Sequence, residues 1–133
     1  MQGADIVVTA TSSREPVIQR EWLSPGTHIN AVGSSIPTAR ELDTATVASA
    51  SLFVDRREST VNESGDYLFA ARETPVTIQA EVGEILIGKA AGRKSPEEIT
   101  LFKSLGLAVE DLAAAAFLFG KAKTLGTGRW VEF

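Results

Sequence analysis

Small and polar residues gather at three places where apolar runs end. They lie at residues 9–13, 33–35 and 103–106. In a parallel sheet the carboxyl ends of the strands share one edge, and glycine or serine there lets the backbone approach a ligand closely. The pattern therefore predicts one small-molecule crevice made by three turns. The plain alternative is that loops of α/β proteins are polar because they lie at the surface.

Other side chains could also carry chemistry. Lys103 closes one of these apolar runs and could donate to a ligand amide or phosphate, whereas a solvated lysine is equally expected. His28 is the only histidine, which excludes a zinc site of several histidines. We expect it to be a hydrogen-bonded structural residue, on the same strand face as Asn30. The acidic residues show no recognisable metal-ligand spacing and are expected to be mostly caps or solvated charges.

These residues need a scaffold in which strands and helices alternate. Apolar, β-branched runs predict strands at 6–11, from 27 towards the turn at 33, at 51–55 and at 99–102. Helices are predicted at 39–50, where 38–41 match a capping box, at 78–87 and at 107–124, with a short one at 17–23. A strand, loop, helix and strand recur at roughly 25-residue spacing, which indicates α/β architecture with a mostly parallel sheet and flanking helices.

Composition restricts the class of protein. The 133 residues, 44% of them hydrophobic, suit a single domain spanning 1–133. The formal net charge of −4 and the scattered basic residues argue against a nucleic-acid partner. Without cysteine the chain has neither disulfides nor thiolate metal sites. We expect no membrane association and a cytoplasmic location, since no basic leader and no apolar run of about 18 residues is visible.

The glycine-rich loop typical of dinucleotide folds is not found in the sequence. Such a loop reads G-x-G-x-x-G and joins a strand to a helix. Gly126, Thr127 and Gly128 form the only G-x-G, but they follow a predicted helix and lack the third glycine. The residues alone therefore predict an α/β half-domain with a small-molecule edge.

Five motifs, taken in order, give the sequence a family resemblance. They are ADIVVTAT at 4–11, GTHINAVG at 26–33, REL at 40–42, ESGD at 63–66 and FKSLGLAVED at 102–111. Together they resemble the ornithine cyclodeaminase/mu-crystallin family, and more closely its mu-crystallin and alanine dehydrogenase branch. The resemblance implies a partial Rossmann-type domain, the second half of an NAD(P)-binding domain with a C-terminal helix. The family's glycine-rich loop and its substrate and dimerisation half would then precede residue 1.

The resemblance also implies which residues contact NAD or NADP. They are Thr9, Ala10 and Thr11 beside the ribose and phosphates, Val32, Gly33 and Ser34 beside the nicotinamide, and Lys103, Ser104 and Leu105 on a second wall. Ornithine cyclodeaminase has an acid/base aspartate after the glycine turn, and Ser35 takes that place here. A serine does not readily exchange a proton near neutral pH, so cyclodeamination is the less favoured reading, and we assign no catalytic residue.

Hydride transfer to or from an imine or amino acid is the activity that the resemblance favours, with a small-molecule substrate and a dimer or higher self-association. The chain alone could also be a non-catalytic binder of a nucleotide or small ligand. A third possibility is an inactive fragment that self-associates, because its first strand would present an unpaired edge.

Overall fold

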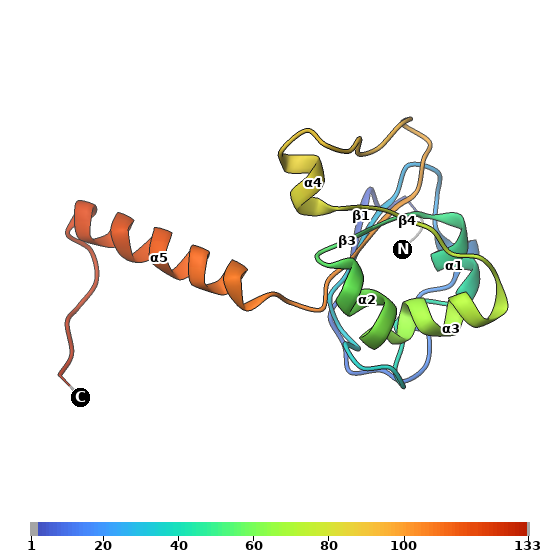
Figure 1. Ribbon diagram of the computed structural model, residues 1–133, viewed down its shortest axis with the longest axis horizontal. Coiled ribbons are helices and arrows are strands. Elements are labelled where there is room, and N and C mark those ends of the chain that lie inside the picture. Colours follow the sequence, from blue (N-terminus) through green and yellow to red (C-terminus); the bar gives the residue numbers. More distant parts are fainter. Residues whose placement is uncertain (1–2, 133) are drawn as a thin grey trace.

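Five parallel strands form the centre of the protein. The computed structural model describes residues 3–132, and within them the sheet has the strand order β1-β2-β5-β3-β4 (Figure 1). All four pairings are parallel, which confirms the predicted α/β architecture. The strands are β1 (Ile6–Thr9), β2 (His28–Ala31), β3 (Ser51–Val54), β4 (Ile78–Glu81) and β5 (Thr100–Lys103).

Strand register aligns the carboxyl ends of the strands. Thr9 pairs with Ala31, and Ala31 pairs with Lys103. Lys103 in turn pairs with Val54 on the other side of β5. Since these residues end their strands, the turns that follow all leave from the same edge of the sheet.

The sheet owes its stability to apolar side chains on both faces. β2, β3 and β5 contribute residues with almost no exposed surface, as expected for central parallel strands. The most deeply buried of these apolar residues are Ile29, Ala31, Leu52, Val54 and Leu101.

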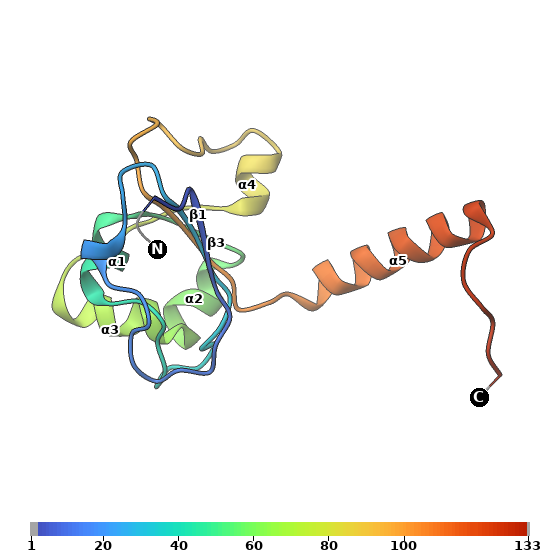
Figure 2. The same ribbon diagram turned by 180° about the vertical axis from the view of Figure 1, so that it is seen from behind.

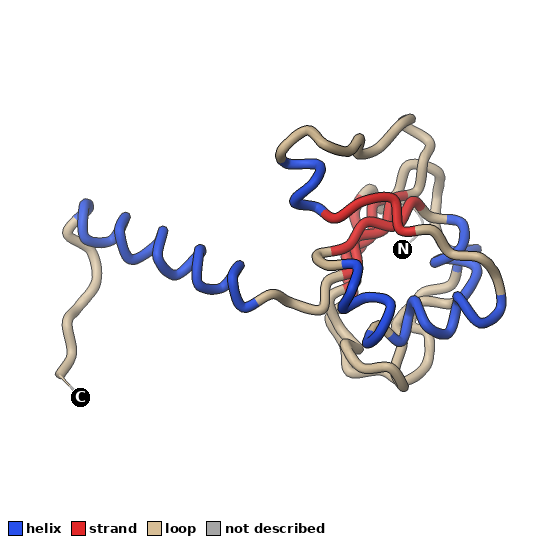
Figure 3. Tube along the Cα trace, viewed as in Figure 1, coloured by secondary structure: helices blue, strands red, loops and turns tan. Residues whose placement is uncertain are grey.

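Short helices connect the strands. In Figure 3, α1, α2 and α3 gather on one side of the strands and α4 lies apart from them. Their bounds are α1 (Thr44–Ser49), α2 (Arg57–Glu63), α3 (Gly65–Glu73) and α4 (Val82–Leu86), and a 3-10 turn η1 spans Arg20–Trp22.

Helix α5 (Ala108–Leu125) projects away from the sheet, as Figure 2 shows from behind. The predicted helix at 107–124 is thus confirmed. None of its residues is buried, although Leu112, Phe117, Leu118 and Phe119 are all apolar and all more than half exposed. A helix that is apolar on several sides normally packs against other elements, so α5 is an unpartnered arm.

Strand β1 forms one edge of the sheet, as predicted. Among the residues that the structure describes, it pairs only with β2. Ile6 and Val8 are 64% and 62% exposed, so one side of this strand also lacks a covering layer.

Several predicted helices are wrong in extent. The helix expected at 39–50 spans only Thr44–Ser49, and its N-cap is Asp43, which accepts a hydrogen bond from Thr46 N at 2.9 Å. The segment 17–23 contains only the single turn η1. The segment 78–87 divides into β4 and α4, because Ile78 and Ala80 alternate inwards beside β3 before Glu81 caps the helix.

Candidate functional site

The turns after β1, β2 and β5 meet at the carboxyl edge of the sheet. Ser34 N donates to Thr11 O at 2.9 Å, which joins the first turn to the second. Ser104 N donates to Ala31 O at 3.1 Å, which joins the third turn to β2. The predicted convergence of the three turns is therefore confirmed. We call the surface formed by residues 9–13, 32–35 and 103–106 the rim.

Glu41 ties the first two turns of the rim together from beneath. Its side chain is fully buried. The carboxylate accepts hydrogen bonds from Thr9 Oγ1 at 2.7 Å, from Thr11 N at 2.5 Å and from Gly33 N at 3.0 Å. The capping box predicted at 38–41 is thus wrong, because the Glu41 carboxylate turns towards the sheet and does not cap a helix.

Gly33 permits this close approach. A Cβ at residue 33 would collide with the backbone of Thr11 and with the Glu41 carboxylate. The next residue, Ser34, has a positive φ of 47°, and its hydroxyl donates to Ser13 O at 2.5 Å. The second turn is therefore held against the first by contacts that a larger residue at position 33 would disrupt.

Lys103 is a residue of the rim whose side chain is buried in an ion pair. Its ammonium is 3.1 Å from Asp66 Oδ2, with both side chains almost fully buried. It also donates to Gly33 O at 2.5 Å. The other oxygen of Asp66 accepts from Glu41 N at 2.8 Å and from Leu42 N at 2.9 Å. Lys103 is thus not a solvated lysine, and a contact with a cofactor stays a prediction.

Asp55 holds the third turn. Its Oδ2 accepts hydrogen bonds from Ser104 Oγ at 3.1 Å, from Leu105 N at 2.7 Å and from Gly106 N at 2.8 Å. Asp55 lies directly after β3, so this carboxylate joins the end of β3 to the segment that leads into α5. The acidic residues were expected to be mostly caps or solvated charges, and buried Asp55 caps the amides of this turn and is not solvated.

Exposure divides the predicted cofactor contacts into two groups. Thr9, Ser34 and Lys103 are buried and bonded within the protein. Gly33, Ser104 and Leu105 are half-buried, whereas Ala10, Thr11 and Val32 are exposed on the rim. The exposed group has surface free for a ligand, and the buried group supports it.

His28 has the structural role that the sequence predicted. Its Nδ1 is 2.7 Å from Thr100 Oγ1, and its Nε2 is 3.3 Å from Asn30 Oδ1. His28 and Asn30 share a face of β2, as expected from their spacing, and both ring nitrogens have protein partners.

Sequence reasoning missed the bonding partners of three buried carboxylates, which belong to Glu41, Asp55 and Asp66. Glu41 is followed by buried Leu42, and Asp66 lies one helical turn before buried Ala70. An acidic residue within such an apolar segment is a signal that the carboxylate is buried and bonded inside the protein. Their partners lie 24 to 32 residues away for several of these bonds, so local spacing could not identify them.

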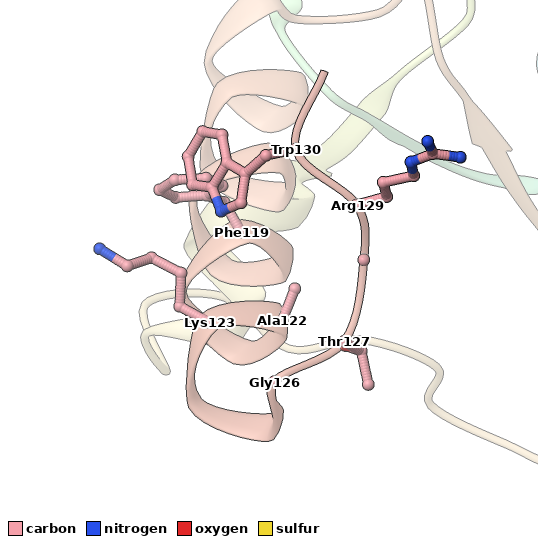
Figure 4. Close-up of a pocket in the computed structure, with 8 residues that line it drawn as sticks. Phe119, Ala122, Lys123, Gly126, Thr127, Arg129 and Trp130 are labelled. Carbon is pink, nitrogen blue, oxygen red and sulfur yellow. The ribbon is translucent and has the colours of Figure 1, made fainter. Parts of the chain in front are cut away.

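A separate hollow lies at the far end of α5. It is lined by Phe119, Lys123 and Trp130 among others, and the ring of Trp130 meets Phe119 edge-on at 6.1 Å (Figure 4). It lies between the helix and the segment after it, away from the strand ends, so we do not take it as the site.

Residues 3–132 contain no helix long and apolar enough to cross a membrane. In the same residues no cluster of three or more His, Cys, Asp or Glu is placed to hold a metal ion.

Known proteins resemble the chain over nearly its whole length. It is 47% identical over 117 residues to ketimine reductase mu-crystallin of Mus musculus, covering 88% of this chain and 36% of the mouse protein. It is 45% identical to a Delta(1)-pyrroline-2-carboxylate reductase of Bacillus cereus, covering 98% of this chain and 41% of that protein. The chain therefore spans well under half the length of these relatives.

Solved structures agree with the sequence matches. Delta(1)-pyrroline-2-carboxylate reductase of Thermococcus litoralis, in complex with NADH and L-proline, superposes with a TM-score of 0.87 at 44% identity over 98% of this chain and 41% of that chain. An archaeal alanine dehydrogenase dimer with bound NAD gives a TM-score of 0.81 at 36% identity over 97% of this chain and 41% of that one. The model of the ornithine cyclodeaminase/mu-crystallin family matches residues 1–125, and the chain belongs to this family.

Proposed function

We propose that this chain is the NAD(P)-binding portion of an oxidoreductase that transfers a hydride to or from an imine or an amino acid. The observation that carries the proposal is the rim, where three turns meet at the carboxyl edge of a parallel sheet. This is where open α/β sheets bind their ligands. Relatives matched over the same residues have reductase or dehydrogenase names, and two of the solved ones hold NADH or NAD.

The rim has features that suit a dinucleotide. The missing Cβ at Gly33 lets the second turn pack directly on the backbone of Thr11, which brings the exposed residues Thr11 and Val32 of the two turns to one surface. Exposed Ala10 and Thr11 present a small side chain and a hydroxyl on the neighbouring turn. When bound, the nicotinamide supplies or accepts the hydride, and the part of these residues is to place it and to exclude water from one of its faces.

Ser35 favours a reductase over a cyclodeaminase. It lies exposed on the second turn, where the resemblance places an acid/base aspartate in ornithine cyclodeaminase. A serine hydroxyl can donate or accept a hydrogen bond, but it does not hold a proton that exchanges near neutral pH. We therefore assign Ser35 to orientation of the ligand and not to proton transfer.

Cofactor titration tests the proposal. Purified chain is titrated with NADH and with NADPH while nicotinamide fluorescence is followed, and saturable binding of one of them is expected. The variant Val32→Asp should weaken binding, because its carboxylate would lose water against the uncharged dihydronicotinamide ring, which the resemblance places beside Val32. The matched control is Val131→Asp, which changes a similarly exposed valine in the segment after α5.

Two results would contradict the proposal for this chain. One is no binding of either nucleotide at millimolar concentration. The other is equal loss of affinity in Val32→Asp and Val131→Asp. Hydride transfer is then assayed with a cyclic ketimine, and with pyruvate plus ammonia, to separate a reductase from a protein that only binds.

We also propose that the chain self-associates through its uncovered surfaces. Ile6 and Val8 on β1 and the apolar residues of α5 are available for this. Exposed strand edges invite pairing with another copy, and an archaeal alanine dehydrogenase relative is a dimer. Sedimentation at increasing concentration tests this, and a monomer throughout would contradict it.

A further inference from the structure

Glu41 is a buried carboxylate without a basic partner. Among residues 3–132, its oxygens form no ion pair, whereas Lys103 is paired with Asp66. The charge is balanced by two backbone amides and one hydroxyl, all directed at the carboxylate. Hydrogen bonds to an ionised acceptor are about twice as strong as neutral ones, so this arrangement offsets part of the cost of burial.

The donors to Glu41 come from two different turns. Thr9 is the last residue of β1 and Thr11 lies in the turn after it, whereas Gly33 belongs to the turn after β2. Glu41 itself lies outside both turns, in the segment before α1. A shift of either turn would therefore stretch a hydrogen bond to this carboxylate.

We propose that Glu41 is a positioning residue for the cofactor, and this rests on the proposed function. It sets the separation between exposed Thr11 on one turn and exposed Val32 on the other, so that both meet one dinucleotide at once. Lys103 completes the arrangement from below, because it bonds Gly33 O and the same Asp66 that holds Glu41 N.

An amide cannot replace this carboxylate. Oε1 accepts from Thr11 N, and Oε2 accepts from Gly33 N and Thr9 Oγ1. In Glu41→Gln one of these oxygens becomes an NH₂ group, which then faces a backbone N–H. One of the two turns loses its tether, while the size and shape of the side chain are kept.

The test compares Glu41→Gln with Glu98→Gln. Glu98 also accepts a backbone N–H, from Lys94, and a hydroxyl, from Ser51, but it lies at the amino ends of β3 and β5, the opposite edge of the sheet. Glu41→Gln should weaken NADH binding about tenfold, which corresponds to about 1.4 kcal/mol. Glu98→Gln should leave the NADH dissociation constant unchanged.

Amide hydrogen exchange by NMR gives a readout that needs no cofactor. In Glu41→Gln the Thr11 and Gly33 amides should exchange faster, while amides at the centre of β5 keep their protection. Unchanged exchange at both amides would overturn the proposal, as would loss of protection across the whole sheet with no change in NADH affinity. If the unmodified chain binds no NADH, the proposed function fails for this chain, and the exchange pattern alone decides whether Glu41 joins the turns.

A milder variant covers the case in which Glu41→Gln does not fold. Thr9→Val removes one donor to the carboxylate and keeps the shape of the side chain. We expect a smaller loss of NADH affinity, about threefold, or roughly half of the tenfold effect on a free-energy scale. Full affinity together with unaltered exchange at Gly33 would count against the proposal.

Discussion

Replacing Lys103 by methionine should strongly destabilise the fold. Methionine has a similar length and no charge, so the change leaves Asp66 buried without its partner. Gly33 O also loses the donor that holds it at 2.5 Å. The substitution therefore tests whether the ammonium is a structural part of the sheet edge.

The size of the effect follows from the burial of the pair. Removing one member of a buried ion pair typically costs about 3–5 kcal/mol, because the remaining charge is uncompensated. Total stabilities of domains are about 5–15 kcal/mol, so a large share would be lost. With a urea dependence of about 2 kcal/mol per molar, the unfolding midpoint should fall by about 2 M.

The assay is urea unfolding followed by tryptophan fluorescence. The chain has two tryptophans, and a Trp130→Phe background leaves Trp22, which lies in η1 directly before the core residue Leu23, as the reporter. Adding Asp66→Asn to Lys103→Met should restore more than half of the lost stability, because Asn keeps the oxygen that accepts from the backbone and removes the charge. The reasoning is refuted if the single variant loses less than about 1 kcal/mol, or if the second substitution restores nothing.

Further predictions concern other parts of the molecule. Gly33→Ala should lower the unfolding free energy by about 1–3 kcal/mol, because its Cβ meets the Thr11 backbone; an unchanged urea midpoint would contradict this. At protein concentrations low enough to keep the chain monomeric, ending it at residue 107 should leave the unfolding midpoint of the sheet unchanged, since no residue of α5 is buried, and a clear fall in a denaturation curve would refute that. The pKa of Glu84 lies below its usual value because it accepts from Glu81 N–H and pairs with Arg57. The folded state therefore gains stability from this carboxylate above the ordinary carboxyl range and loses it as pH falls through the lowered pKa. The gap in melting temperature between the native chain and Glu84→Gln should accordingly narrow as pH falls below the ordinary carboxyl range. A gap that is constant with pH would contradict the assignment.

The strands could be predicted because their signal is local. The runs around Ile29 and Leu52 are buried in the sheet as their composition indicates. The run around Val7 also forms a strand, but Ile6 and Val8 are exposed because β1 lies at the edge of the sheet. The segment from Ile78 could not be resolved from its pattern, since apolar residues at 78, 82 and 85 fit a helix as well as a strand followed by a helix. Pairing with β3, a contact between distant residues, decides in favour of the strand.

The meeting of three turns at the rim could be predicted from the sequence. The buried side chains that hold these turns together could not. Turns after parallel strands must share an edge, so the location of Ser34 and Ser104 followed from the strand assignment. The Glu41 tether depends on donors up to 32 residues away. The motif at 38–41 also resembled a capping box, and only tertiary contacts direct Glu41 towards the sheet.

The central place of β5 has a consequence for synthesis on the ribosome. β5 fills the gap between β2 and β3, yet it comes nearly fifty residues after β3 along the chain. At translation speeds of roughly 5–20 residues per second, roughly 2–9 seconds pass between the synthesis of β3 and that of β5. Until then neither β2 nor β3 can pair with β5. During that interval two strand edges with unpaired backbone N–H and C=O groups are open to other molecules, which makes this stage the one at which a chaperone would help most.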